Sequence, residues 1–272
     1  MNVAQAVQHC IALGLARLDA QLLILHAAGR PAHDRAWLLA HDTDDLPLQT
    51  QASLSALATR RAAGEPLAYL TGHKEFFGLD LQVDARVLDP RADTETLVEW
   101  ALEVLPGTQA ARMIDLGTGS GAIALALKAT RPLLEVHAVD YSTDALTVAR
   151  GNAQRLGLEV QFQQGSWLSS VRGRFDAIVS NPPYIRADDR HLTALTHEPL
   201  QALASGADGL DDIRRIIAQA PKHLEPGGWL LLEHGYDQAP AVCALLAAAG
   251  FTAVQSRQDL AGTARCSGGQ MP

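Results

Sequence analysis

The sequence is poor in cysteine, in aromatic side chains and in basic residues. Its 272 residues include 5% aromatic residues and 22 Lys and Arg against 30 Asp and Glu, which gives a formal net charge of -8 at pH 7. Its three cysteines, Cys10, Cys243 and Cys266, are far apart, which argues against a disulfide framework or a zinc site and favours a reducing compartment. The acidic balance argues against direct nucleic acid binding, since binding to phosphates needs clustered Lys and Arg.

Long uninterrupted apolar runs are absent as well. The apolar N-terminal segment, residues 11–28, is interrupted by Arg17, Asp19 and Gln21, which predicts an amphipathic helix and no membrane span. The N-terminus shows neither the basic start nor the apolar core of a signal peptide. We expect a soluble, cytoplasmic protein without membrane contact, and we expect it to be a monomer.

The histidines are not spaced as metal ligands. His191, His197 and Glu198 lie close together in one segment, but the ten histidines include no His-Glu-x-x-His pattern. A solvated loop accounts for this group, and we expect no metal site.

The composition of the chain changes near residue 75. Residues 1–64 are rich in Ala, Leu, Gln and Arg, and two rows at helical spacing stand out, one of Leu18, Leu22 and Leu25 and the other of Leu54, Leu57 and Arg61. These rows predict a small bundle of about four short helices, with the apolar stripes in its core. Residues 75–88 then alternate between apolar and polar, which predicts a strand or hairpin whose apolar side carries Phe77, Leu79, Leu81 and Val83.

Beyond this segment, helical and apolar strand patterns follow one another. A helix is predicted from Thr94, with its end at Pro106-Gly107. Strands are then predicted at 112–116, 135–140, 160–164, 175–180, 229–233, 252–257 and 264–267, and helices at 120–130, 142–156, 210–224 and 238–249. This alternation is typical of an α/β fold with a parallel sheet and helices on both faces.

A glycine loop, Gly117-Thr118-Gly119-Ser120-Gly121, follows the first of these strands. Ligands of open α/β sheets bind beyond the carboxyl ends of the strands, and glycines let the backbone approach a ligand closely. The spacing differs from the Gly-x-Gly-x-x-Gly of dinucleotide-binding proteins. Asp115 lies just before the loop. It either orients the loop or, if the cofactor is S-adenosylmethionine, contacts its methionine part.

Asp140 ends the second strand and is the candidate acceptor for ribose hydroxyls. A ribose partner suits NAD and S-adenosylmethionine equally well. The alternative is that Asp140 caps the helix that starts at Ser142.

The tetrapeptide Asn181-Pro182-Pro183-Tyr184 directly follows the apolar strand 175–180. Together with the glycine loop it resembles the amino-methyltransferases that use S-adenosylmethionine and share an (Asn/Asp)-Pro-Pro-(Tyr/Phe) motif. A carboxamide nitrogen is a poor nucleophile, but it can be aligned with a methyl group if fixed acceptors hold both N–H bonds. The Asn181 side-chain oxygen and the Pro182 carbonyl are those acceptors, Pro183 stiffens the turn, and Tyr184 supplies a flat apolar face. No catalytic acid or base is required.

Further segments resemble the release factor glutamine N5-methyltransferase family. They are residues 65–79, 87–95, 115–121, Gly165-Ser166-Trp167, 180–185, Glu198-Pro199, 204–210 and Pro226-Gly227-Gly228. One departure is Ala92-Asp93, where the family form is closer to Pro-Glu. The resemblance covers residues 60–265 and implies a class I S-adenosylmethionine-dependent methyltransferase: a Rossmann-like, seven-stranded, mostly parallel sheet with a small N-terminal helical bundle. It divides the chain into a helical substrate-docking domain (1–74), a β-hairpin linker (75–92) and a catalytic domain (93–272).

The resemblance also implies the reaction and the roles of the site residues. The reaction is methylation, by S-adenosyl-L-methionine, of the side-chain amide nitrogen of glutamine in the Gly-Gly-Gln motif of bacterial peptide chain release factors. The cofactor would be bound by Asp115, Gly117, Thr118, Gly119, Ser120, Gly121, Asp140, Trp167 and Asn181, and the glutamine by Asn181, Pro182, Pro183 and Tyr184; Asn181, Pro182 and Tyr184 are the catalytic candidates. Trp167 would neighbour the adenine, or simply pack at the base of its loop.

Two alternative acceptors stay open on sequence grounds. One is a glutamine of a large-subunit ribosomal protein, because the enzyme that methylates it shares the catalytic motifs. The other is a nucleic acid amine, which the acidic balance disfavours. A catalytically silent binding protein would be expected to lose the tetrapeptide.

The C-terminus repeats the tripeptide that this family modifies, as Gly268-Gly269-Gln270. Chance is the simpler explanation for small residues beyond the last strand. The other hypothesis is that this tail enters an active site as a pseudosubstrate, in which case truncation after Ser267 would lower the Michaelis constant for release factor.

Overall fold

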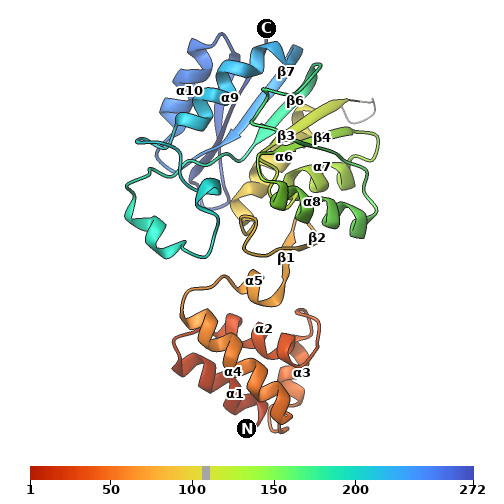
Figure 1. The fold of residues 1–272 in the computed structure, drawn as a ribbon, viewed down its shortest axis with the longest axis vertical. Coiled ribbons are helices and arrows are strands. Elements are labelled where there is room, and N and C mark those ends of the chain that lie inside the picture. Colours follow the sequence, from red (N-terminus) through yellow and green to blue (C-terminus); the bar gives the residue numbers. More distant parts are fainter. Residues whose placement is uncertain (106–110) are drawn as a thin grey trace. The chain divides into compact units, whose positions relative to one another are not determined.

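The first unit of the chain, Met1–His73, is a bundle of short helices (Figure 1). The computed structural model describes residues 1–105 and 111–272, so the predicted helix end at Pro106-Gly107 lies outside the described residues. The helices of this unit are α1 (Val3–Ala12), α2 (Arg17–Ala27), α3 (Arg35–Ala40), α4 (Leu48–Ala62) and α5 (Leu67–Thr71). A reciprocal pair of hydrogen bonds between Asn2 and Gln5 caps the start of α1.

One of the two predicted apolar rows of the bundle is only partly correct: Leu25 is fully buried and Leu22 is partly buried, but Leu18 is not part of the core. Leu18 is 50% exposed, whereas Ala20, Leu23 and Ile24 are fully buried. The segment 11–28 is not one helix, because the chain turns at Gly14 and α2 begins only at Arg17.

The second predicted row is correct at its apolar position, where Leu54 is fully buried. Arg61, at the end of the same row, reaches Asp19 of α2 with Nε 2.7 Å from Oδ2. This side of α4 therefore contributes Leu54 to the core of the bundle and Arg61 to an ion pair with α2.

The predicted hairpin is present as β1 (His73–Phe76) and β2 (Leu79–Gln82). Phe77, however, belongs to its two-residue turn, with φ of +50°, and Gly78 follows with φ of +77°. Asn152, fully buried in the second unit, holds β2 by accepting a hydrogen bond from Gln82 N and donating to Gln82 O.

The second unit, Lys74–Pro272, contains a seven-stranded sheet. Its strands are β3 (Arg112–Leu116), β4 (Glu135–Asp140), β5 (Gln161–Gln164), β6 (Phe175–Ser180), β7 (Leu224–Glu233), β8 (Thr252–Gln258) and β9 (Ala264–Gln270), in the order β5-β4-β3-β6-β7-β9-β8. The pairs from β5 to β7 are parallel, and β9 is antiparallel to both β7 and β8. The predicted mostly parallel α/β fold is confirmed.

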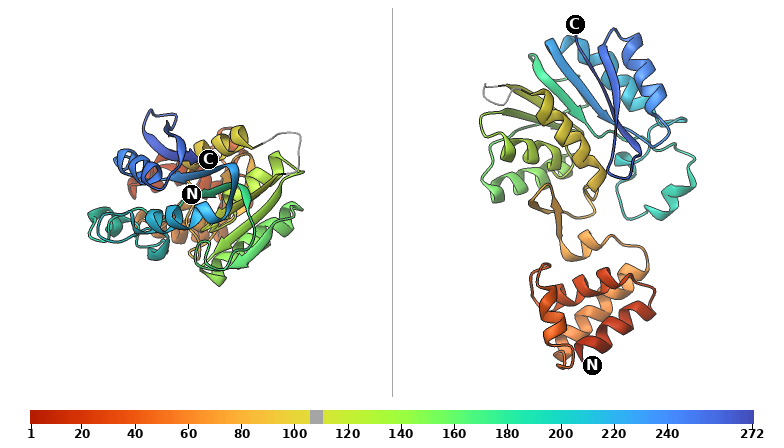
Figure 2. Two further views of the ribbon diagram at one scale, coloured as in Figure 1. Left: turned by 90° about the horizontal axis from the view of Figure 1, so that it is seen from above. Right: turned by 180° about the vertical axis from the view of Figure 1, so that it is seen from behind.

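Helices cover both faces of this sheet, with α6, α7 and α8 on one side and α9 and α10 on the other (Figures 1 and 2). They are α6 (Glu95–Val104), α7 (Ala122–Thr130), α8 (Thr143–Leu156), α9 (Asp211–Gln219) and α10 (Ala239–Ala248), with short 3-10 turns η1 (Ala92–Thr94), η2 (Arg190–Ala194), η3 (Leu200–Ala202) and η4 (Ala220–Lys222). Under α9 and α10 the core includes the fully buried Phe175, Ile178, Ile213, Leu230 and Val242.

The strand order reverses between β3 and β6. From β3 the chain moves outward to β4 and β5, and it then returns to form β6 on the opposite side of β3. This reversal is the topological switch point at which open α/β sheets bind ligands. Leu116 is paired with Ser180, so the glycine loop and the tetrapeptide leave the sheet side by side.

The C-terminal tripeptide Gly268-Gly269-Gln270 is part of β9 and does not lie beyond the last strand. A Cβ atom on Gly268 would lie 2.7 Å from Leu230 O and 2.9 Å from the Trp100 ring. Close packing therefore explains the glycine. Because β9 is hydrogen-bonded on both sides, the pseudosubstrate hypothesis would require the sheet to come apart, and we abandon it.

Candidate active site

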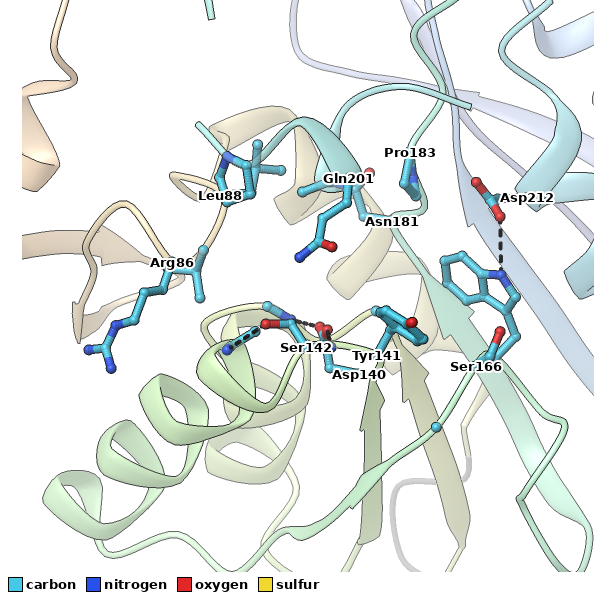
Figure 3. A pocket seen from close by; sticks show the side chains of 18 of the residues that line it. Arg86, Leu88, Asp140, Tyr141, Ser142, Ser166, Asn181, Pro183, Gln201 and Asp212 are labelled. Carbon is cyan, nitrogen blue, oxygen red and sulfur yellow. Dashed lines mark hydrogen bonds between the residues drawn. The ribbon is translucent and has the colours of Figure 1, made fainter. Parts of the chain in front are cut away.

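A cavity of about 310 Å³ lies at the carboxyl ends of the parallel strands (Figure 3). Each strand from β3 to β6 contributes through the loop that follows it, and two further segments close the sides. The lining residues are Gly117, Gly119, Asp140, Tyr141, Ser142, Ala145, Gly165, Ser166, Trp167, Asn181, Pro183, Asp212 and Arg215, with Arg86, Val87 and Leu88 from one segment and Pro199, Gln201 and Ala202 from the other.

The glycine loop reaches this cavity through Gly117 and Gly119. The N–H of Gly117 donates to Val139 O at 2.8 Å, which ties the start of the loop to β4. A Cβ atom on Gly117 would lie 3.3 Å from the Trp167 ring, and φ there is +72°. Both the backbone conformation and the close approach of the ring therefore require glycine at this position.

Four predicted cofactor residues do not line the cavity: Asp115, Thr118, Ser120 and Gly121. Asp115 is fully buried and accepts a 2.6 Å hydrogen bond from Thr118 Oγ1. Ser120 O accepts from Asn152, and Gly121 packs on Leu125, which lies 3.0 Å from where its Cβ would stand. These residues shape the loop from inside the protein.

The Asp115 carboxyl is incompletely satisfied. Its Oδ1 atom has no hydrogen-bond partner of normal geometry among the described residues. Burial raises the pKa of Asp115 to about 7, although the Thr118 hydroxyl and the N–H of Ala124 stabilise the charged form. The Asp115 carboxyl thus takes its donors from the loop and from the start of α7.

Asp140 lines the cavity and holds two backbone segments together. Its Oδ2 accepts from Gly119 N and its Oδ1 from Ser142 N, both at 2.8 Å (Figure 3). Ser142 itself caps α8 by accepting from Ala145 N. Burial raises the pKa of Asp140, while its hydrogen bonds with backbone N–H groups oppose the rise. Each carboxyl oxygen keeps lone-pair capacity for a further donor, so the capping contact and a ligand contact are compatible.

Trp167 packs over the glycine loop and is held by its ring nitrogen. Nε1 donates to Asp212 Oδ1 at 3.2 Å, as drawn in Figure 3. Asp212 is fixed in turn by Arg215 and by the Ser205 hydroxyl. The backbone of Trp167 has φ of +52°, which is uncommon for a bulky residue. Its contacts therefore hold the indole in one position on the cavity wall.

The tetrapeptide enters the cavity with Asn181 and Pro183, whereas Pro182 and Tyr184 are not among the lining residues. Asn181 Nδ2 donates to Thr94 Oγ1 at 3.2 Å. Tyr184 packs against the core under α9 and α10, and its carbonyl accepts from Gln238 Nε2 at 3.1 Å. Burial raises the pKa of the Tyr184 hydroxyl, so this hydroxyl is neutral at physiological pH. Both ends of the tetrapeptide are thus anchored.

Comparison with known proteins gives two family matches in this chain. Residues 93–241 match the methyltransferase small domain, and residues 4–72 match the PrmC N-terminal domain. The release factor glutamine methyltransferase of Bordetella pertussis is 51% identical over 95% of this chain and 96% of its own length. That of Xylella fastidiosa strain Temecula1 is 51% identical over 94% of each chain.

The chain belongs to the release factor glutamine methyltransferase family. The resemblance predicted from the motifs is therefore confirmed. Among solved structures, a methyltransferase from Pyrococcus furiosus covers 81% of this chain and 96% of its own, with a TM-score of 0.56 and 19% identity. At that identity it supports the methyltransferase fold alone.

Sequence reasoning missed several residues of the site. Thr94 and Glu233 contact the tetrapeptide, and Asp212 fixes the indole of Trp167. A signal existed for Glu233, because it ends β7 at the same edge of the sheet as Asp140 and Asn181. Thr94 and Asp212 carried no comparable signal.

The His191, His197 and Glu198 segment has a different use from metal binding. Glu198 is buried and its Oε1 lies 2.5 Å from Arg91 Nη2. This ion pair ties the segment that carries Pro199 to the residue that precedes η1. In the described parts of the chain, no group of three His, Cys, Asp or Glu residues is arranged to hold a metal. Nor does any described helix have both the length and the apolar character needed to cross a membrane.

Proposed function

We propose that this chain transfers a methyl group from S-adenosyl-L-methionine to the side-chain amide nitrogen of the glutamine in the Gly-Gly-Gln motif of peptide chain release factors, in the cytoplasm and as a monomer. The near full-length relatives that carry this activity in their names support the choice of substrate. The geometric observation behind the chemistry is the orientation of Asn181. Its Nδ2 is engaged by Thr94, so Oδ1 is the amide atom that remains to accept a hydrogen bond from a substrate.

The residues around the cavity fit S-adenosylmethionine. Asp140 keeps acceptor capacity for ribose hydroxyls at the end of β4. Asp115 is fully buried and outside the cavity lining, and it supports the glycine loop from inside by accepting from Thr118 Oγ1. No protein atom lies within 4 Å of a Cβ placed on Gly119, so the loop leaves open space where backbone and ligand can meet.

Bound S-adenosylmethionine supplies an electrophilic methyl group on a positively charged sulfur. The protein's task is then to hold a weak nucleophile in line with that methyl group. Asn181 Oδ1 and the Pro182 carbonyl accept the two N–H bonds of the glutamine amide, which lets its nitrogen pyramidalise during attack. The nitrogen gains its bond to the methyl carbon as the sulfur–methyl bond breaks, and it then releases one of its two protons to solvent. Pro182 and Pro183 fix φ on both sides of this carbonyl, so the acceptors are preorganised.

The decisive experiment is transfer of labelled methyl from S-adenosylmethionine to purified release factor, next to a Gly-Gly-Ala variant of the same factor. We expect labelling of the first protein and none of the second. Labelling of neither would overturn the proposal and direct the assay to the ribosomal protein glutamine. Equal labelling of both would place the methyl group on another residue.

A further inference from the structure

A buried carboxyl group lies behind the tetrapeptide. Glu233 ends β7 and is 1% exposed. Ser180 is paired with Leu232 in the parallel register of β6 and β7, so Glu233 comes level with Asn181 at the edge of the sheet. A carboxyl group in this position is costly to bury unless its oxygens have donors.

Glu233 contacts one end of the tetrapeptide directly. The Tyr184 hydroxyl donates to Glu233 Oε1 at 3.3 Å. The other oxygen, Oε2, is buried and has no partner of normal hydrogen-bond geometry in the described part of the chain. Glu233 therefore has one donor and lacks a second.

Thr94 is placed to supply that second donor. Its Oγ1 accepts a hydrogen bond from Asn181 Nδ2, and the residue is 4% exposed. Since a hydroxyl has a single proton, that proton still needs an acceptor. The Thr94 hydroxyl is close enough to the Glu233 carboxyl to lower its pKa by a side-chain hydrogen bond. Thr94 and Glu233 each provide what the other lacks.

We propose that Glu233 and Thr94 are positioning residues, which together hold the Asn181 carboxamide with Oδ1 directed at the substrate amide. In the proposed arrangement, the Thr94 hydroxyl accepts from Asn181 Nδ2 and directs its own proton toward Glu233. If this direction were reversed, the Thr94 hydroxyl would donate to Asn181 Oδ1, and Nδ2 would face the substrate. An N–H donor there cannot accept the N–H of glutamine, so the reversed arrangement is inactive. The inference rests on the proposed function, in which Asn181 Oδ1 is an acceptor for the substrate.

The charge on Glu233 decides which direction is stable. An ionised carboxylate can only accept, which enforces the active direction. A protonated carboxyl can donate to Thr94 Oγ1 and so permits the reversed one. Burial raises the pKa of Glu233 to about 7, with Asp93 adding to the rise and Arg265 opposing it. The protonation state of this carboxyl thus changes near physiological pH.

Of the titratable groups that face Glu233, Tyr184 and Cys266 stay neutral in that range and Arg265 stays charged. Burial raises the pKa of the Tyr184 hydroxyl and of the Cys266 thiol. Arg265 keeps its charge, since burial lowers its pKa less than its carboxylate neighbours, among them Asp259, raise it. Among these neighbours, Glu233 is the carboxyl group that contacts the tetrapeptide directly.

The role of Thr94 is tested by steady-state methyl transfer to release factor with Thr94→Val and Thr94→Ser. We expect Thr94→Val to lower kcat at least ~10-fold, with the affinity for S-adenosylmethionine unchanged, because the amide loses its fixed orientation. Thr94→Ser, which keeps the hydroxyl, should stay within ~3-fold of the wild-type kcat. Thr130→Val is the matched control, since it removes a hydroxyl at the end of α7 that donates to Ala126 O of the same helix. A Thr94→Val enzyme that folds and turns over like Thr130→Val would overturn the proposal.

The role of Glu233 is tested by the pH profile of Glu233→Gln. The wild-type kcat should rise with pH through about 7 as the carboxyl ionises. The glutamine variant keeps an acceptor oxygen for Thr94 but does not titrate, so its kcat should be flat over the same range. If kcat of the Glu233→Gln variant still fell at low pH as it does in the wild type, the inference would be wrong. Failure of the wild-type enzyme to label the Gly-Gly-Gln glutamine would instead refute the proposed function, so the two failures are distinguishable.

Discussion

At the scale of single residues, the site works by committing each polar atom to one partner. Asn181 uses its N–H toward Thr94 and keeps its oxygen for the cavity. Each carboxyl oxygen of Asp140 accepts one hydrogen bond from a backbone N–H group, that of Gly119 or that of Ser142. What remains uncommitted is an array of acceptors, which suits a substrate amide and a ribose, both of which donate hydrogen bonds.

Replacing Asn181 with Ala should leave a folded protein that binds S-adenosylmethionine but transfers methyl at least ~100-fold more slowly. The reason is that one of the two fixed acceptors for the glutamine N–H bonds is lost. Single-turnover methyl transfer measures the rate, and calorimetric titration measures cofactor binding. Near-normal turnover would mean that the two-acceptor arrangement is wrong.

Replacing Asp115 with Asn should change how stability depends on pH. The pKa of Asp115 is raised from 3.8 to about 7 in the folded protein, so its stabilising contribution is complete below pH 3.8 and is lost as the pH rises through 7. The asparagine variant lacks this loss. At pH 8 its free energy of unfolding should exceed that of the wild type by roughly 4 kcal/mol, the equivalent of about three pKa units. At pH 4 the two proteins should unfold together, and a constant difference at both values would contradict the pKa.

The sequence allowed some of these residues to be predicted and not others. Gly117, Asp140 and Asn181 stand directly after apolar strands, where ligands bind in this class of fold, so local pattern was enough. Thr94 and Glu233 act through contacts with residues 87 and 49 positions away in the chain. Such contacts depend on the strand register and on how α6 packs, and no local pattern encodes them.

At the scale of elements, β9 shows how packing decides which residues a strand can hold. It is antiparallel to β7 and β8, and at Gly268 there is no room for a side chain between Leu230 and Trp100. The strand was predicted over 264–267, but it continues to Gln270 although glycine is unfavourable in strands. Tertiary packing overrides this preference, as it overrides the predicted position of Leu18 in α2.

Replacing Gly268 with Ala should destabilise the protein by about 1–3 kcal/mol, the usual cost of overpacking a core. Gly151→Ala is the matched control, because Gly151 lies in α8 with no atom within 4 Å of a Cβ. There the same change should stabilise by about 0.5–1 kcal/mol through helix propensity. Urea unfolding compares the two variants. Equal effects would show that the space around Gly268 is not limiting.

At the scale of the whole molecule, the chain consists of two units, each with its own apolar core. Leu23, Ile24 and Leu54 are fully buried in the first, and Phe175 and Ile178 are fully buried in the second. Composition alone indicated a change near residue 75. The family resemblance, and no physical pattern, suggested that the helical unit docks the substrate.

A chain limited to Lys74–Pro272 should fold, since the sheet, the cavity and its lining lie within this unit. We expect its affinity for S-adenosylmethionine to stay within ~3-fold of the full chain. Its KM for release factor should rise at least ~10-fold, because a second contact surface raises the effective concentration of the substrate loop. A short Gly-Gly-Gln peptide, which cannot reach the helical unit, should be methylated equally by both proteins. An unchanged KM for release factor would argue against docking by residues 1–73.

The position of Gly268-Gly269-Gln270 inside β9 has a consequence for selectivity in the cell. The enzyme carries in its own chain the letters that we propose it reads in its substrate. The Gln270 amide donates to Gly227 O at 2.9 Å, and both glycines are buried. A tripeptide that is hydrogen-bonded within a sheet cannot enter a narrow active site. Other copies of the enzyme therefore do not compete with release factor as methyl acceptors. Recognition then requires the Gly-Gly-Gln tripeptide to lie in an exposed loop. Buried Gly-Gly-Gln tripeptides in other proteins escape methylation even though their sequence is the same.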